Sequence, residues 1–160
     1  MKRSIRLTIA FLLTALLVLT AIGVWAAPKF QGTVPGIPVT GGGSCSDGTI
    51  DMGTALFTPQ TTECIITVEL VEDPAALYSP APEGKAFTGS TFKVTADPKD
   101  TIVQVCYAYP PEFANKNAKI YRLNEDAAPT VWVEVSGAVI GNGTICVTSA
   151  VGIFSLIGDS

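Results

Sequence analysis

The strongest constraint on the fold is an apolar residue at every second position, repeated in several short segments after residue 60. In residues 62–71 apolar side chains alternate with Glu and Thr. In residues 91–96 they are Phe92, Val94 and Ala96, with Thr91, Lys93 and Thr95 on the opposite face. A period of two is typical of strands half-buried in a sheet. The β-branched and aromatic composition of these segments agrees, so we expect an all-β fold.

Turn signals separate the predicted strands. Asp73-Pro74, Asp97-Pro98 and Pro110-Pro111 mark turns, because proline fixes φ and cannot donate to a ladder. Gly141-Asn142-Gly143 lies between two apolar pairs and predicts a tight hairpin; Asn142-Gly143-Thr144 also fits the N-glycosylation pattern, although the hairpin turn explains it better. Residues 111–117 favour a single helical turn. Seven to nine short strands with this spacing predict one immunoglobulin-like antiparallel β-sandwich with Greek-key connections.

The first 26 residues have the layout of a secretory signal peptide. Lys2, Arg3 and Arg6 precede an apolar stretch, and Val24 and Ala26 supply the small residues of a cleavage site. We expect cleavage after Ala26 and a mature protein that is secreted or held at the cell surface. The alternative is an uncleaved anchor, since the stretch has about the 20 residues that a spanning helix needs; the protein would then meet the membrane only through this segment.

Residues 27–44 are rich in proline and glycine, and they predict a flexible linker between the signal peptide and the folded domain. The folded β-sandwich domain is then expected to span residues 45–160. Cleavage after Ala26 removes three of the ten basic side chains and leaves seven against fourteen acidic ones, a net charge of −7. Such a surface repels phosphate backbones, so nucleic acid is not an expected partner.

Four cysteines are expected to form two disulfides, because the compartment of an exported protein is oxidising. Three pairings are possible, and we favour Cys45–Cys64 with Cys106–Cys146, since each then closes a loop within one half of the domain. A zinc site is the alternative. It is not favoured, because no two cysteines have the close spacing of zinc motifs and the chain contains no histidine.

The C-terminal half resembles ZU5-like β-sandwich modules of bacterial secreted and surface proteins, and in outline the related GAIN-type sandwiches. The resemblance rests on the order of short motifs over residues 88–158. These are a strand with Cys106, the pair Tyr121-Arg122, a strand with Trp132, then Cys146 and a closing strand with Phe154. It implies a sandwich fold.

Some of those relatives cut their own backbone at a His-Phe-Ser or His-Leu-Thr triplet. Phe154-Ser155 matches the end of such a triplet, but Ile153 stands where the histidine would be. A serine hydroxyl without a base is a poor nucleophile, so we expect no self-cleavage.

The lack of histidine also removes Ser-His-Asp and Cys-His arrangements and the commonest catalytic metal ligand. Ser44 and Ser90 lie in glycine-rich surroundings where a lysine could activate them, but Lys85 and Lys93 are more typical of solvated strand ends. We therefore expect no catalytic, cofactor-binding or metal-binding residues.

Clustered carboxylates are the alternative source of chemistry. Paired carboxylates are the requirement of glycoside hydrolysis, and flexible oxygen-rich loops bind Ca²⁺. All of the clusters lie at predicted turns, where Asp bonds to nearby backbone. They are Glu72-Asp73, Asp97 with Asp100, Glu125-Asp126, and Asp47 near Asp51.

Four aromatic residues in the strand-rich half could pack in the core or form a recognition surface. These residues are Tyr107, Tyr109, Tyr121 and Trp132. We expect Trp132 in the core; for Tyr109 and Tyr121 both interpretations stay open. The sequence thus predicts a non-catalytic secreted or cell-envelope module with a structural, adhesive or protein-binding role. Its expected partners are other envelope or extracellular proteins, which it could meet by pairing an edge strand. The alternative is a small extracellular hydrolase that acts through carboxylates, with or without Ca²⁺.

Overall fold

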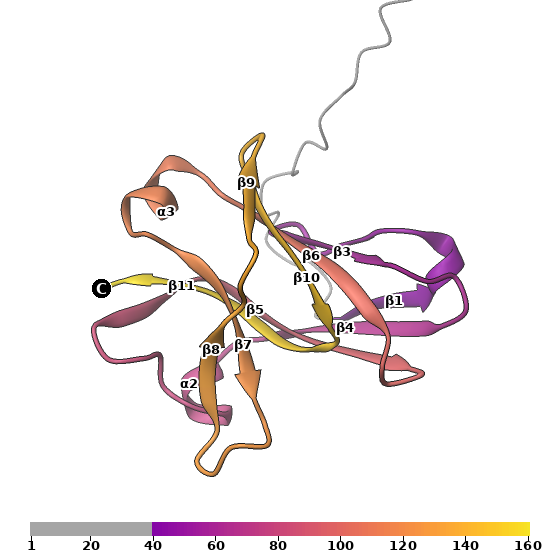
Figure 1. The fold of residues 1–160 in the computed structure, drawn as a ribbon, viewed down its shortest axis with the longest axis horizontal. Helices are drawn as coiled ribbons and strands as arrows, with labels where there is room; N and C mark the ends of the chain where they lie inside the picture. The colour runs from indigo at the N-terminus through magenta and orange to yellow at the C-terminus, as the bar shows by residue number, and fades with distance from the viewer. Residues whose placement is uncertain (1–39) are drawn as a thin grey trace, which may run out of the picture.

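Two antiparallel sheets packed face to face make up residues 40–160, the part of the chain described by a computed structural model (Figure 1). The predicted signal peptide and residues 27–39 of the predicted linker lie outside the described residues. The six-stranded sheet contains, in spatial order, β1 (Thr40–Ser44), β4 (Ile65–Val71), β5 (Lys85–Asp97), β11 (Gly152–Asp159), β7 (Lys119–Asn124) and β8 (Val131–Glu134). The five-stranded sheet contains β2 (Ile50–Asp51), β3 (Ala55–Pro59), β6 (Ile102–Ala108), β10 (Thr144–Ala150) and β9 (Val139–Gly141). Three short helical segments join them: η1 (Cys45–Asp47), α2 (Pro74–Leu77) and α3 (Pro111–Asn115). The predicted all-β sandwich is confirmed.

The main core lies between the sheets and is built from the alternating residues that the sequence pattern indicates. Ile66 and Val68 of β4 and Phe92 and Val94 of β5 are buried there. Phe92 meets Phe57 of the other sheet edge to face, with ring centroids 5.3 Å apart. Such aromatic pairs add to the stabilisation that comes from buried area alone.

A second, smaller core covers the outer face of the six-stranded sheet. Residues 72–84, which include α2, fold over this face and bring Tyr78 and Ala81 against it. The buried residues beneath are Tyr121, Leu123, Trp132, Ile153 and Ile157. Around β11 and β7 the six-stranded sheet is therefore covered on both faces.

One detail of the predicted alternation in β5 is wrong. Thr91 was expected on a polar, solvent-facing side of its strand, but it is buried. Its hydroxyl donates to the hydroxyl of Ser155, directly opposite in β11, at 2.8 Å. This bond satisfies both hydroxyls, which lowers the cost of burying them.

The predicted start of the folded domain at Cys45 is also wrong by at least five residues. Thr40 to Ser44, the end of the predicted linker, form β1 and pair with β4 in the register Thr40↔Glu69. Backbone pairing needs no side chains, so a glycine-rich segment can form an edge strand. The disulfide at Cys45 holds its end beside β4.

Several local predictions are confirmed. Asn142 and Gly143 have φ values of 52° and 74° and join β9 to β10 in a two-residue hairpin. The helical turn predicted over 111–117 is α3. The described residues contain more strands than the predicted seven to nine, because β1, β2 and β9 are short edge strands with little apolar alternation.

The two disulfides have the predicted pairing. Cys45–Cys64 is buried in the main core. Cys106–Cys146 joins residues directly opposite each other in β6 and β10, with a Cα–Cα distance of 4.1 Å. Disulfides persist in oxidising compartments, so the pairs indicate an extracytoplasmic protein.

Candidate interaction site

Strand β8 forms one edge of the six-stranded sheet, and its orientation is fixed by Trp132. The indole of Trp132 packs edge to face on Phe87, with ring centroids 5.5 Å apart, in the outer core. Its Nε1 donates to the main-chain oxygen of Ser79 at 2.9 Å. This confirms the predicted burial of Trp132. Since side chains alternate along a strand, Val131, Val133 and Val135 face the opposite side, toward the space between the sheets.

The valine face of β8 is not covered by the five-stranded sheet. Val131 is 43% exposed and Val133 is 50% exposed. The next strand in sequence, β9, is the edge of the other sheet, and there Val139 is 69% and Ile140 is 55% exposed. Figure 1 shows β8 and β9 following one another along one side of the sandwich. We call this surface, built from residues 131–141, the β8–β9 side.

The backbone of β8 has an open outer edge. The amide of Val135 donates to the carbonyl oxygen of Ile120 in β7 at 2.9 Å. In an antiparallel ladder the bonding direction alternates with each residue. Val133 and Val131 therefore bond toward β7, while the N–H and C=O groups of Trp132 and Glu134 point away from the sheet. Among the backbone bonds of residues 40–160, none satisfies this outer edge.

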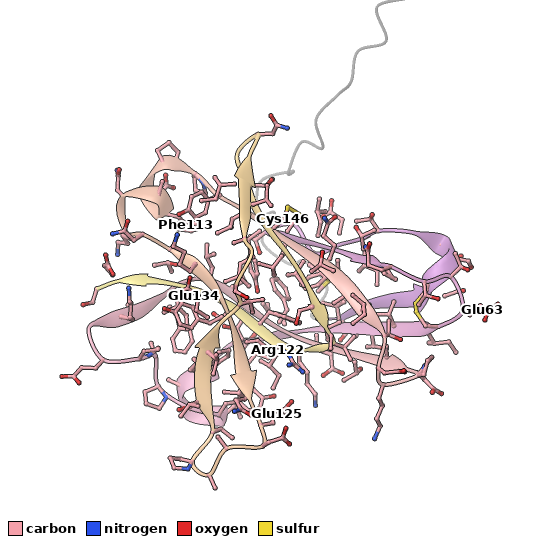
Figure 2. All side chains as sticks on the ribbon, in the orientation of Figure 1. Glu63, Phe113, Arg122, Glu125, Glu134 and Cys146 are labelled. Carbon is pink, nitrogen blue, oxygen red and sulfur yellow. A yellow bond between two sulfur atoms is a disulfide. The ribbon has the colours of Figure 1, made fainter. Side chains whose placement is uncertain are left out.

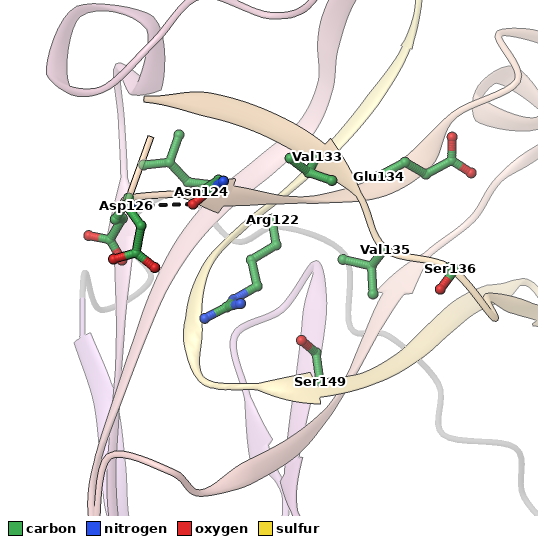
Figure 3. A pocket seen from close by; sticks show the side chains of 10 residues that line it. Arg122, Asn124, Asp126, Val133, Glu134, Val135, Ser136 and Ser149 are labelled. Carbon is green, nitrogen blue, oxygen red and sulfur yellow. Dashed lines mark hydrogen bonds between the residues drawn. The ribbon is translucent and has the colours of Figure 1, made fainter. Parts of the chain in front are cut away.

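Beside the valine face, a cleft of about 620 Å³ opens between β7, β8 and β10 (Figure 3). Its lining residues are Arg122, Leu123, Asn124, Glu125, Asp126, Val133, Glu134, Val135, Ser136 and Ser149. Figure 3 shows Arg122 and Ser149 reaching into the cleft from its two walls, with the side chain of Glu134 turned away from Arg122.

Arg122 has a structural role at the bottom of this cleft. Its Nη2 donates to the carbonyl oxygen of Val151 at 2.8 Å, which ties β7 to the turn between β10 and β11. Its Nε is buried and has no hydrogen-bond partner. Gly152 lies directly beneath the guanidinium group, where a Cβ atom would stand 2.5 Å from Nε.

Three of the carboxylates predicted as possible ligands or catalysts, those of Asp47, Asp51 and Asp73, bond to nearby backbone amides. Asp73 accepts a bond from the amide of Ala76 and caps α2. Asp47 and Asp51 accept similar bonds from the amides of Ser44 and Gly53. At the turn after β7 the side-chain oxygen of Asn124 accepts a bond from the amide of Asp126. Glu125 and Asp126 thus form an exposed acidic turn at the rim of the cleft.

The predicted pair Asp97 and Asp100 lies at the turn between β5 and β6. Asp100 lines a separate open cleft of about 590 Å³ together with Glu63, and Asp97 is not among its lining residues. Within residues 40–160, no group of three or more acidic or cysteine side chains is placed to hold a metal ion.

The serines considered as nucleophiles bond to groups other than lysine. Ser44 caps η1, and Ser90 accepts a bond from the hydroxyl of Thr54 at 3.1 Å. Lys85 instead pairs with Asp159 at 2.6 Å, fastening β5 to the end of β11. This hydrogen bond raises the pKa of Lys85 and, helped by a bond from Asn117, lowers the pKa of the Asp159 carboxyl.

Three tyrosines of the strand-rich half are core residues. Tyr107, Tyr109 and Tyr121 are all buried. Tyr107 donates to the carbonyl oxygen of Phe154, and Tyr109 to that of Ala118, each at 2.9 Å. Burial raises the pKa of both bonded hydroxyls, that of Tyr107 strongly.

The side-chain view in Figure 2 places Arg122, Glu125 and Glu134 close to β7 and β8, far from Glu63 at the opposite end of the sandwich.

The sequence predicted partner binding by an edge strand without saying which edge. The signal was present in β8, where a buried tryptophan alternates with three valines. To find the open edge, one must also know where the facing sheet ends.

No protein-family model matches the chain, and neither the curated proteins nor the solved structures compared with it contain a similar protein. Residues 40–160 form no helix with the length and hydropathy needed to cross a membrane. The fold is an antiparallel β-sandwich with two disulfides within the chain. On its β8–β9 side, the backbone edge of β8 is unpaired and aliphatic side chains are exposed.

Proposed function

We propose that this protein is a non-catalytic, secreted or cell-envelope module that binds other extracellular or envelope proteins through its β8–β9 side. One observation carries the proposal: an unpaired strand edge lies on the same side of the sandwich as exposed aliphatic residues of β8 and β9. Val131, Val133 and Ile140 are on the strand faces directed between the sheets, and Val139 is on the outer face of the five-stranded sheet. The ZU5-like resemblance of the C-terminal half agrees with a module of this kind.

Open edges and apolar patches are costly to keep on a protein surface. An edge strand presents unpaired N–H and C=O groups that promote aggregation, and natural proteins usually protect such edges with charge, proline or a covering loop. Exposed apolar surface beside an edge is typical of an interaction site. The proposed binding mode is therefore β-augmentation, in which an extended segment of the partner adds a strand to the sheet.

Charge around the site narrows the class of partner. Glu125, Asp126 and Glu134 surround the cleft, and the mature chain is expected to have a net charge of −7. Nucleic acid is disfavoured by this field. An extended polypeptide that is apolar at alternate positions and has few acidic residues is the best match.

Self-cleavage is not part of the proposed function. Ser155 lies in the middle of β11, is fully buried, and its hydroxyl accepts a bond from Thr91. We expect the purified protein to give one intact mass without fragments at the Phe154–Ser155 bond. The carboxylate hydrolase alternative is favoured by no contact among the described residues.

Site-specific photo-crosslinking tests the proposed function. A photoreactive residue placed at Val133 or at Val139 is expected to capture a defined protein partner from intact cells of the source organism. The same residue at Lys99, which is exposed in the β5–β6 turn, is the matched control. Capture should fall when Val133→Lys is added to the Val139 probe. Equal capture at Lys99, or none at either valine, would contradict the proposal.

A further inference from the structure

We propose that β8 pairs with β8 of a second copy of this chain, antiparallel and centred on Val133. The inference rests on the proposed function of the β8–β9 side and names its partner. It is drawn from the register of the open edge and from the side chains that this register brings together.

The hydrogen-bonding groups fix which registers are possible. Trp132 and Glu134 point their N–H and C=O groups outward, so an antiparallel partner strand must bond at these two residues. Two identical antiparallel strands can therefore pair in three registers. Trp132 lies opposite Trp132 in the first, Trp132 lies opposite Glu134 in the second, and Glu134 lies opposite Glu134 in the third. These three registers place different side chains against each other.

The Val133-centred register is the only one of the three that sets neither two Glu134 residues nor two Trp132 residues against each other. With Trp132 opposite Glu134 of the second copy, Val133 faces Val133, and Val131 faces Val135. The valine face then continues from one copy to the other, and matched β-branched side chains are favourable cross-strand pairs. The register that places Glu134 opposite Glu134 sets like charges against each other, which is destabilising. The remaining register sets the two Trp132 residues opposite and leaves Val133 beside Val131.

The surroundings of β8 fit the same arrangement. In the Val133-centred register the acidic turn at Glu125 and Asp126 lies toward the segment after β8 of the second copy. That segment, residues 135–141, contains no charged side chain. The two acidic turns therefore approach an uncharged segment instead of each other.

The other open edges offer less to a second copy. At β1 the central residues Gly41, Gly42 and Gly43 have no side chains for cross-strand contacts. Strand β2 has two residues and β9 has three, too few for a ladder of this length. Of the four edges, β8 has the longest run of outward apolar side chains.

A contact made by one short strand buries less surface than the roughly 1,200 Å² at the lower end of stable interfaces. We therefore expect weak, reversible association that strengthens at high ionic strength, because salt screens the repulsion between two acidic chains. Sedimentation of the mature protein over a wide concentration range should show a monomer–dimer equilibrium. Val133→Lys should abolish the dimer, whereas Ile65→Lys, at an exposed aliphatic residue of β4 outside the β8–β9 side, should leave it unchanged.

Cysteine crosslinking tests the register itself. Residues opposite each other in a non-hydrogen-bonded pair have Cα atoms about 4.5 Å apart, a separation that a disulfide can span. Cys106 and Cys146 show this geometry within the chain, with a Cα–Cα distance of 4.1 Å. Val133→Cys should form a reducible dimer under mild oxidation. Glu134→Cys, on the same strand but opposite Trp132 of the second copy, should remain monomeric, as should Val139→Cys.

The possible results separate this proposal from the proposed function. A wild-type protein that stays monomeric at millimolar concentration, with Val133→Cys crosslinking no faster than Val139→Cys, overturns the pairing of two copies. The proposed function survives that result if the photoreactive residue at Val133 still captures a different protein. A dimer that resists Val133→Lys, or that crosslinks through Glu134→Cys instead, also overturns the proposal. Matching thermal unfolding of each variant and the wild type confirms that the variants are folded.

Discussion

The hydroxyl of Tyr107 donates a hydrogen bond of 2.9 Å to the main-chain oxygen of Phe154 and so joins the two sheets through the middle of the core. Tyr107 lies in β6, the central strand of the five-stranded sheet, and Phe154 lies in β11 of the six-stranded sheet. Both side chains are fully buried. The bond satisfies a hydroxyl that would otherwise be costly to bury, and it holds the sheets in one relative position.

Removing this hydroxyl is expected to lower the stability of the fold. Tyr107→Phe keeps the ring and loses the bond to Phe154, which should reduce the free energy of unfolding by about 1 kcal/mol. Urea denaturation measures the loss. Tyr121→Phe is the matched control, because Tyr121 is also buried but its hydroxyl forms no hydrogen bond to another described residue. Equal stability of the two variants would show that the bond contributes nothing.

The same residue predicts how stability depends on alkaline pH. Burial raises the pKa of Tyr107 well above the usual value of about 10. In the unfolded chain the hydroxyl ionises near its usual pKa, while in the folded protein it stays protonated. The stabilisation that comes from keeping the Tyr107 hydroxyl protonated in the fold is therefore complete below about pH 10, and it is lost progressively as the pH rises above this value. Denaturation at increasing pH should show a fall in stability that is shallower for Tyr107→Phe. Tyrosinate absorbance of the folded protein should show one hydroxyl that does not titrate until the protein unfolds.

The disulfide between Cys106 and Cys146 should make a larger contribution. The two residues are 40 positions apart, and closing a loop of that length stabilises a fold by about 4 kcal/mol in the chain-entropy model. The double variant Cys106→Ala/Cys146→Ala should lose stability of this order in urea denaturation. It should keep the native circular dichroism spectrum, because the two strands remain paired by their backbones. A double variant as stable as the wild type would contradict the expected role.

The period-two pattern was enough to predict the sheets, the main core and the hairpin at Asn142 and Gly143. These features depend on neighbours in sequence: alternating side chains select a face, and a residue pair that tolerates positive φ selects the turn. The pairing of the cysteines was predicted for a related reason, since each bond closes a loop within one half of the chain.

The features that sequence reasoning missed depend on contacts between distant segments. Nothing local to Thr91 shows that its side chain will be buried and that Ser155 will accept its hydrogen bond. The glycines of β1 resemble a linker because their role is to pair through the backbone with β4. The exposure of Val133 likewise depends on where the facing sheet ends. The candidate site was therefore predicted only as an edge strand of unspecified position.

Gly152 is expected to be the position in the turn between β10 and β11 that tolerates substitution least. A methyl group there would stand 2.5 Å from Nε of Arg122, whose side chain is held in place by its bond to the oxygen of Val151. Gly152→Ala must displace the guanidinium group or the turn. The free energy of unfolding should fall by about 1–3 kcal/mol, the usual cost of overpacking a filled site.

The matched control is Gly141→Ala in the neighbouring hairpin. An added Cβ at Gly141 meets no atom within 4 Å, so this change should leave stability nearly unchanged. The cause of the loss at Gly152 can then be tested by combining Gly152→Ala with Arg122→Ala, which removes the guanidinium group that the methyl would meet. If the collision is the cause, the cost of Gly152→Ala measured in the Arg122→Ala background should be much smaller than in the wild type. An unchanged cost would assign the loss to the backbone of the turn and not to Arg122.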